Sequence, residues 1–218
     1  MKIKPPHQSN WERGLTLIEV MVVFAVILFV AALYLPTLQQ RHTGCRINCV
    51  NHLKQVGLAF RTFSLDNNYR YPMQTPATNG TLEIAAYAPA YMHFQVMSNE
   101  LTTPKILLCP QETQRTAATN FGPGLDNGRI SYFVGLAANE TNAQMFLAGD
   151  RNMTNGAATN RRFLDLTTNK LAGWTAELHN QQGNVCFADG SVQQFTSSRV
   201  RQAIAATGDP TNRLAMPY

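Results

Sequence analysis

Residues 15–35 read LTLIEVMVVFAVILFVAALYL, and this stretch decides the fold because it holds a single charged side chain, Glu19. As a helix it would span roughly 30 Å, which is the thickness of the hydrocarbon core of a bilayer. No other stretch of the chain is comparably long and apolar. The sequence therefore predicts one membrane-spanning helix near the start of the chain.

The charges that flank this stretch predict its orientation. Lys2, Lys4 and Arg13 precede it, whereas the first basic residue after it, Arg41, lies farther from its end. Positively charged flanks stay on the cytoplasmic side of a membrane. We therefore expect residues 1–14 to be cytoplasmic and most of the chain to lie outside the cytoplasm.

Glu19 is the anomaly of the apolar stretch, because a carboxylate inside a membrane span costs a few kcal/mol unless it finds a partner. One interpretation is a shallow side chain that reaches back to the lipid headgroups. The other is that cleavage after Gly14 exposes the amine of Leu15, one helical turn from Glu19. The carboxylate would then pair with that ammonium in its own chain or in a neighbouring subunit.

These residues resemble the prepilin N-terminus of type IV pilins and type II secretion pseudopilins, with Pro36 where many such proteins carry a helix-loosening proline. Leu15 departs from the usual Phe. The resemblance implies cleavage between Gly14 and Leu15 by a prepilin peptidase, N-methylation of Leu15, and a role for Glu19 in assembly. It also implies other pilin-like subunits and an inner-membrane assembly platform as partners.

An ordinary secretory signal peptide is the competing interpretation. Its apolar region would cover residues 20–32 and end in a poor cleavage site at residues 30–32. Glu19 at the head of that region, and the length of the apolar stretch, argue against it. Sequencing of the mature N-terminus separates the two, because one predicts a methylated Leu15 and the other a start near Leu33.

The composition narrows the class of protein. The chain has 218 residues and a formal net charge of +5, and only 14% of its residues are charged, against about 25% in ordinary soluble domains. Such a chain is not a disordered polyelectrolyte. It also lacks the clustered Lys and Arg of a nucleic-acid binder, so no nucleic-acid partner is expected.

Four cysteines are present, and their spacing matches no zinc-binding pattern. Cys45 and Cys49 lie four residues apart on a predicted helix, a spacing that strains a direct bond between them. Disulfide pairing of one of them with Cys109 or Cys186 is more plausible in an exported chain. Buried free thiols remain the alternative.

After Pro36 the chain changes to a second helical pattern over residues 39–67. Its apolar residues recur at helical spacing and form one stripe. They are Cys49, Leu53, Val56, Phe60 and Phe63. The stripe predicts an amphipathic core helix, and the resemblance to pilin-like proteins implies that it packs against a sheet.

The rest of the chain reads as short strands and polar loops. Strands are predicted at residues 130–136 and 144–148, and residues 183–188 and 191–195 form a hairpin. Asp189 and Gly190 join the hairpin, since both residue types tolerate positive φ. Other expected elements are a short helix near residues 82–91, an exposed loop at 152–162, and a helix at 197–206 capped by Ser198.

The fold class predicted is α+β, with a long N-terminal helix packed on a small antiparallel sheet of about four strands, as in pilins. The expected organisation is a leader, an assembly helix, an amphipathic helix, a globular α+β domain and a loose C-terminal tail. These cover residues 1–14, 15–38, 39–67, 68–207 and 208–218.

A second resemblance lies near the C-terminal end. His179 precedes Asp189 with nine residues between them, and Gly190 follows. This H-x9-DG pattern is similar to one in a large bacterial group of prepilin-like proteins. Other segments resemble that group as well, namely residues 51–59, 109–110, 131–132 and 148–150.

His179, Asp150 and Asp189 are weak candidates for a metal site. Calcium takes six to eight oxygen ligands and disfavours His, and the chain has no dense Asp cluster. We therefore expect no cofactor, with calcium as the alternative. A structural role is predicted instead, in which Asp189 sets the hairpin turn and His179 packs over the hairpin or hydrogen-bonds its backbone.

An enzyme is not expected, because the sequence contains no GxSxG, HExxH or GxxxxGK[ST] motif. Asp150 and Arg151 are predicted to form a surface pair or a turn. A hydrolase that uses His179 and Asp189 would require an open cleft around His179. The prediction is a structural pilin-like subunit of the bacterial inner membrane; the alternative is a membrane-anchored periplasmic or surface protein that forms no filament.

Overall fold

The structure is a computed structural model that describes residues 16–157, 162–167 and 171–218, without the side chains of residues 34–45. It divides into two compact units, Met1–Thr43 and Gly44–Tyr218. Each unit is described by itself. The predicted leader, with Gly14 and Leu15, lies outside the described residues, as does the side chain of Pro36.

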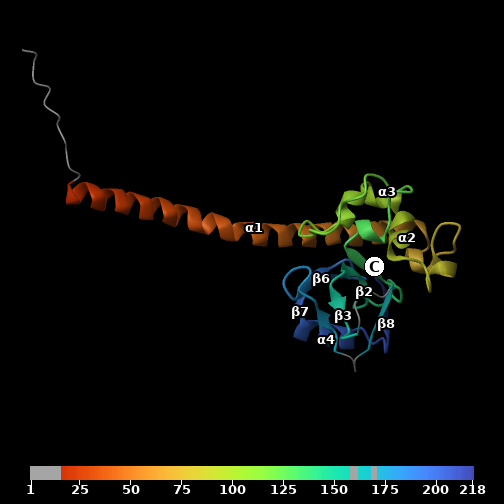
Figure 1. The fold of residues 1–218 in the computed structure, drawn as a ribbon. Helices are drawn as coiled ribbons and strands as arrows, with labels where there is room; N and C mark the ends of the chain where they lie inside the picture. Colours follow the sequence, from red (N-terminus) through yellow and green to blue (C-terminus); the bar gives the residue numbers. More distant parts are fainter. Residues whose placement is uncertain (1–15, 158–161, 168–170) are drawn as a thin grey trace, which may run out of the picture. The chain divides into compact units, whose positions relative to one another are not determined.

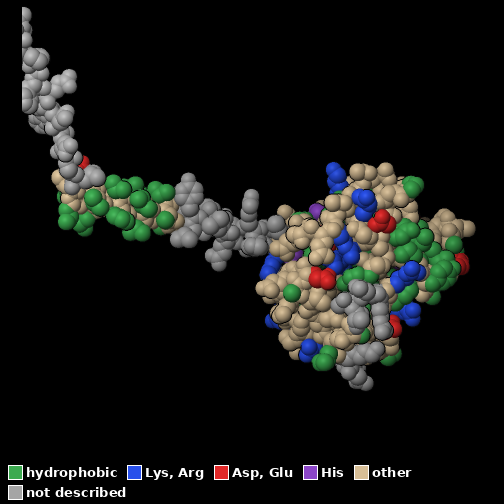
Figure 2. Space-filling view, in the orientation of Figure 1, with side chains coloured by type: hydrophobic (Ala, Val, Ile, Leu, Met, Phe, Trp, Pro, Cys, Tyr) green, Lys and Arg blue, Asp and Glu red, His purple; other side chains and the backbone are tan. Residues whose placement is uncertain are grey.

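Helix α1 (Leu17–Asp66) covers both the apolar stretch and the predicted amphipathic helix. In the first unit its apolar side chains are exposed from Leu17 to Leu33, and they cover the described part of the helix in Figure 2. Among the described residues, no helix has the length and apolarity that a membrane crossing requires. The predicted span of residues 15–35 is described only in part.

The second unit is built on a six-stranded antiparallel sheet with the strand order β4-β8-β1-β2-β6-β7. Its strands are β1 (Tyr132–Gly135), β2 (Phe146–Asp150), β4 (Phe163–Leu166), β6 (Gln182–Phe187), β7 (Val192–Thr196) and β8 (Asn212–Ala215). Two further strands, β3 (Met153–Thr154) and β5 (Gly173–Trp174), pair with each other. The α+β prediction is confirmed, with more strands than the four expected.

Short helices complete the second unit. They are α2 (Ala90–Gln95), α3 (Ser98–Leu101), α4 (Ser197–Ala206) and the 3-10 turns η1 (Pro72–Gln74), η2 (Leu82–Ile84), η3 (Pro104–Leu107) and η4 (Asn127–Arg129). Helix α4 has the predicted bounds, but its N-cap residue is Thr196 rather than Ser198. The helix expected near residues 82–91 is two elements: η2 ends at Ile84, and α2 begins after its N-cap residue, Pro89.

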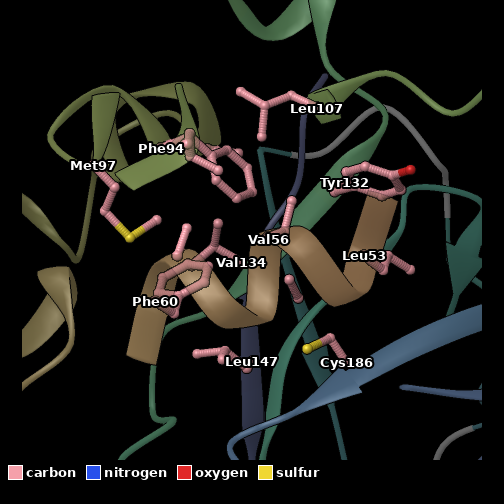
Figure 3. Packing of buried hydrophobic residues seen from close by; sticks show 14 of the residues in the cluster. Leu53, Val56, Phe60, Phe94, Met97, Leu107, Tyr132, Val134, Leu147 and Cys186 are labelled. Atoms are coloured by element: carbon pink, nitrogen blue, oxygen red, sulfur yellow. The ribbon is translucent and has the colours of Figure 1, made fainter. Parts of the chain in front are cut away.

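The first core lies between α1 and one face of the sheet. The predicted stripe of α1 is buried along its whole length and contacts Phe94 and Met97 on one side and Val134 and Leu147 on the other (Figure 3). In Figure 1 this part of α1 accordingly runs between the α2–α3 region and the strands. The stripe is the main reason why the helix stays on the sheet, since burying each large apolar side chain contributes about 1.5–3 kcal/mol.

Gly57 permits the close approach of α1 to the sheet. A Cβ atom at this position would lie 2.6 Å from the Sγ of Cys186 in β6. Real Cβ atoms do not come this close, so any side chain would push the helix away. A glycine in a helix interior usually costs about 0.5–1 kcal/mol, and here the tight packing offsets that cost.

The second core lies on the opposite face of the sheet, under α4. Successive residues of a strand point to opposite faces, so Phe133 enters this core while its neighbours Tyr132 and Val134 enter the first. Val200 and Ile204 of α4 cover it. Both faces of the sheet are therefore buried.

The hairpin prediction is confirmed. Strands β6 and β7 pair in register, with Cys186 opposite Val192, and Gly190 adopts a φ of 82° in the turn between them. The carboxylate of Asp189 accepts a hydrogen bond of 2.8 Å from the N–H of Ser191. Asp189 thus stabilises the turn from the solvent side.

Two predictions about loops are wrong. Residues 208–218 are not a loose tail, because β8 inserts between β1 and β4 and buries Leu214, Ala215 and Met216. Residues 152–162 are not one exposed loop, because Asn152 is fully buried and β3 follows it. In both cases the segment pairs with residues far away in the sequence, which local patterns do not reveal.

Candidate functional site

The described chain begins with a capped helix end. The N–H and the hydroxyl of Thr16 donate hydrogen bonds of 3.0 and 3.1 Å to the carboxylate of Glu19. In return the N–H of Glu19 donates to the Thr16 hydroxyl at 3.4 Å. Thr and Glu three residues apart at a helix start form a capping box, which satisfies backbone donors that the helix leaves unpaired.

Sequence reasoning missed this contact, although the signal T-x-x-E is present at residues 16–19. The two predicted partners of Glu19 were the headgroups and the Leu15 ammonium, and Leu15 lies outside the described residues. Glu19 is surrounded along the helix by exposed apolar side chains, including Leu17, Ile18 and Met21. The capping box therefore gives this isolated carboxylate a local partner.

A second polar group lies inside the second unit, around His179. The Nε2 of His179 lies 3.2 Å from the Oδ2 of Asp150, at the end of β2, and 3.4 Å from the Sγ of Cys109. The N–H and the side-chain amide of Asn184, in β6, donate to the same Asp150 oxygen at 2.7 and 2.9 Å. The side chains of His179 and Asp150 are fully buried, so this is a closed polar centre.

A disulfide borders this centre. Cys49 of α1 is bonded to Cys109, which follows η3, and their Cα atoms lie 5.2 Å apart. This is one of the pairings that the sequence left open. Cys186 is a buried free thiol, and burial raises its pKa to about 12. The side chain of Cys45 lies outside the described residues.

The backbone that carries His179 adopts a left-handed turn. His179, Asn180 and Gln181 have φ values of 53°, 50° and 61°, which cost non-glycine residues of the order of 1 kcal/mol each. Asn152 holds this turn: its amide donates to the carbonyls of Leu178 and Gln182, at 2.8 and 3.0 Å. The surrounding contacts thus keep the His179 ring in place.

Asp189 does not belong to this centre. It lies beyond β6, five residues after Asn184, which is roughly 16 Å along an extended strand. Its described hydrogen bonds go to Ser191 and to the side chain of Arg61. The structure therefore brings His179 and Asp150 together and leaves Asp189 in the turn, so the three weak metal candidates do not form one calcium site.

Asp150 ends β2 and Arg151 lies in the turn that follows, as one of the two predicted alternatives has it, but Arg151 is buried and forms no surface pair. Its guanidinium donates to both carboxylate oxygens of Glu112, at 2.8 and 3.3 Å, and to Glu177. Burial alone would raise the pKa of Glu112, but the hydrogen bonds from Arg151 and from the N–H of Gln114 outweigh it and lower the pKa. The two carboxylates thereby balance the positive charge of the buried guanidinium.

The burial of His179 argues against the hydrolase alternative. That alternative required an open cleft at the imidazole, and the His179 side chain has no solvent-exposed surface. The centre also offers no serine or other hydroxyl nucleophile among the described contacts of His179. The described structure therefore lacks the open cleft that the hydrolase alternative requires at His179.

Replacing His179 by Ala in the disulfide-bonded protein is expected to lower the free energy of unfolding by about 1–3 kcal/mol, since Asp150 loses a buried partner. His179→Asn is the matched variant, because Asn tolerates positive φ and so removes the ring without adding backbone strain. Urea unfolding of the two variants separates the loss of the imidazole next to Asp150 from the backbone strain that Ala adds at a positive φ. A loss below 0.5 kcal/mol in both, near the ~0.5 kcal/mol typical of surface changes, would contradict a structural role.

Comparison with known proteins supports the N-terminal assignment. Residues 12–35 match the family model described as the prokaryotic N-terminal methylation motif, a range that includes Gly14, Leu15 and Glu19. Comparisons with curated proteins and with solved structures found no match. The N-terminal region of the chain thus carries a prepilin-type methylation motif and is similar there to type IV pilins and pseudopilins.

Proposed function

We propose that this chain is a structural subunit of a pilus or of the pseudopilus of a type II secretion system. A prepilin peptidase cleaves it after Gly14, and Leu15 is N-methylated. Until assembly, the helix over residues 15–38 holds it in the bacterial inner membrane, with the N-terminus in the cytoplasm and the globular unit in the periplasm or outside the cell.

The observation that carries this proposal is the position of the methylation motif. The motif covers residues 12–35 and coincides with a helical segment whose apolar side chains are exposed from Leu17 to Leu33. Burying one large apolar side chain stabilises a protein by about 1.5–3 kcal/mol, and in water these exposed side chains lack that stabilisation. A lipid bilayer before assembly, and the same helices of neighbouring subunits after it, would bury them.

The second unit supports the proposal in another way. Its two cores are filled by its own residues from Cys49 onward, so it needs no contact with the apolar segment to complete them. A subunit that moves from a membrane into a filament requires this independence. We also propose that the chain has no enzymatic activity of its own and needs no cofactor for assembly.

Changing Gly14 to Leu is expected to block removal of the leader. The peptidase must take the backbone at the scissile bond into its site, and glycine obstructs it least. Mass spectrometry of the membrane fraction should show the full-length chain and no N-methylated Leu15. Gly14→Ala is the matched control, and its much smaller side chain should leave most of the protein cleaved. Normal maturation of the Gly14→Leu protein would contradict the assignment.

A filament-free membrane protein is the second candidate, because it could use the same processing. Shearing cells and testing the released filaments for this chain distinguishes the two. Cleaved chain in sheared filaments supports the subunit. Cleaved chain found only in the membrane supports the alternative, and leaves the processing step intact.

A further inference from the structure

The disulfide and His179 form the one group in the described part of the chain that places three metal-ligating side chains together. One ligand atom from each of Cys49, Cys109 and His179 lies within 4.8 Å of the others, and all three residues are buried. They come from α1, from the loop after η3 and from the left-handed turn. The fold therefore gathers two sulfurs and one imidazole nitrogen from three distant segments.

The distances in this group fit a metal-centred arrangement. Around a tetrahedral zinc ion, ordinary bond lengths give ligand separations of about 3.6 Å for sulfur to nitrogen and about 3.3 Å for nitrogen to oxygen. The Nε2 of His179 lies 3.4 Å from the Sγ of Cys109 and 3.2 Å from the Oδ2 of Asp150. The imidazole nitrogen thus lies at a metal-site separation from the Cys109 sulfur, and also close to Asp150, although the Asp150 oxygen lies outside the group of three ligand atoms.

We propose that the reduced form of this protein binds one zinc ion through Cys49, Cys109 and His179. The Asp150 carboxylate, which lies 3.2 Å from the imidazole but outside this group of three, moves in to the fourth position once the sulfurs separate. The site goes beyond the proposed subunit function and does not depend on it. Two thiolates and an imidazole select a borderline-soft ion such as Zn²⁺ over calcium or magnesium.

Residues around the group would orient its ligands. Asn184 holds the Oδ2 of Asp150 by two hydrogen bonds, and the Oδ1 of Asp150 is buried with no hydrogen-bond partner among the described residues. The guanidinium of Arg46 donates to the His179 carbonyl at 3.4 Å. Metal sites depend on such outer contacts, because they fix the direction of each ligand.

The disulfide and the metal are mutually exclusive, since each uses both sulfurs. A dithiol reductant breaks the Cys49–Cys109 bond, supplies two electrons and two protons, and is oxidised to its own disulfide. Binding of Zn²⁺ then releases the two thiol protons to water while the sulfurs separate to about 3.8 Å. Cys49 and Cys109 therefore form a covalent crosslink in oxidising conditions and, together with His179, a metal crosslink in reducing ones.

Cobalt titration of the full chain in detergent tests the site. The protein is reduced with a phosphine and titrated with Co²⁺ under exclusion of oxygen. We expect one Co²⁺ per chain, with thiolate-to-cobalt charge-transfer absorption and the visible bands of a tetrahedral ion, and displacement by Zn²⁺. The matched control is the Cys45→Ser/Cys186→Ala double variant, which removes the other two thiols and should titrate like the wild type.

The His179→Ala variant should bind Co²⁺ at least about tenfold more weakly, because loss of a direct ligand exceeds the 10-fold to 100-fold loss typical of outer contacts. Equal affinity and equal spectra in wild type and His179→Ala would overturn the proposal. A second measurement avoids the variant: Zn²⁺ should raise the urea midpoint of the reduced wild type. An unchanged midpoint would likewise overturn it.

Discussion

Glu19→Val is expected to reduce incorporation of this chain into filaments by more than about tenfold while leaving cleavage after Gly14 intact. In a packed bundle of helices the carboxylate would neutralise the N-methylated Leu15 ammonium, which the variant leaves buried without a partner. An unpaired buried charge costs about 3–5 kcal/mol, and 1.4 kcal/mol is already a factor of ten. Insertion into the membrane should be unchanged or better, because an insertion cost is deleted.

The capping box supplies a sharper control for this prediction. Glu19→Gln removes the charge, but its side-chain oxygen can still accept the Thr16 hydrogen bonds seen in the structure. If the charge pair drives assembly, Glu19→Gln should fail as Glu19→Val does. The measurement compares leader cleavage, membrane fraction and sheared-filament content of the two variants with wild type. Wild-type filament content in Glu19→Gln would assign Glu19 to helix capping alone.

Removal of the Cys49–Cys109 disulfide is expected to lower the free energy of unfolding by about 4 kcal/mol. The bond closes a loop with a sequence separation of 60 residues, and a crosslink over such a loop restricts the unfolded chain by about that amount. Urea unfolding of the Cys49→Ala/Cys109→Ala variant, followed by the fluorescence of the buried Trp174, measures the loss.

Reduction of the wild type is the matched control for this experiment. A reductant in metal-free buffer should lower the stability of the wild type by a similar amount and leave the double variant unaffected. Wild-type stability that does not respond to the reductant would show that the crosslink contributes little. Reduction removes the crosslink without removing the sulfur atoms. The comparison therefore separates the stability lost with the crosslink from the stability lost to the small cavities that the two Ala side chains create.

The parts of the fold that the sequence predicts well are those encoded by nearby residues. The stripe from Cys49 to Phe63 repeats at helical spacing, so its burial follows from residues within a few turns of each other. The hairpin follows from Asp189 and Gly190 between two alternating runs, because the turn chemistry and the strand pattern agree. Helix α4 has the predicted bounds for a similar local reason.

The parts that sequence reasoning missed depend on distant partners. The residues of β8 read NRLA between Pro210 and Pro217, a pattern too short and too polar to indicate a central strand. It becomes one because β1 and β4 supply hydrogen bonds on both sides. A strand defined by its neighbours leaves little trace in its own sequence.

The same limit explains the errors at the candidate site. Asp150 and Arg151 are charged neighbours, which normally indicates a surface, yet both are buried. Asp150 is tolerated because Asn184 and His179 face it, and Arg151 because Glu112 does, and these partners lie 29 or more positions away. The H-x9-DG spacing also joined two residues that the structure separates, since His179 lies in the buried turn and Asp189 in the hairpin.

The position of β8 has a consequence for how the chain is made. Ribosomes produce β1 and β4 well before residues 212–215, yet these two strands never pair with each other and meet only through β8. Until that segment is available, both keep an unpaired backbone edge, the kind of surface on which nascent or partly exported chains aggregate or are degraded. The sheet is therefore completed only when the last residues of the chain are available. A chain that ends before residue 212 lacks β8 and leaves β1 and β4 unjoined.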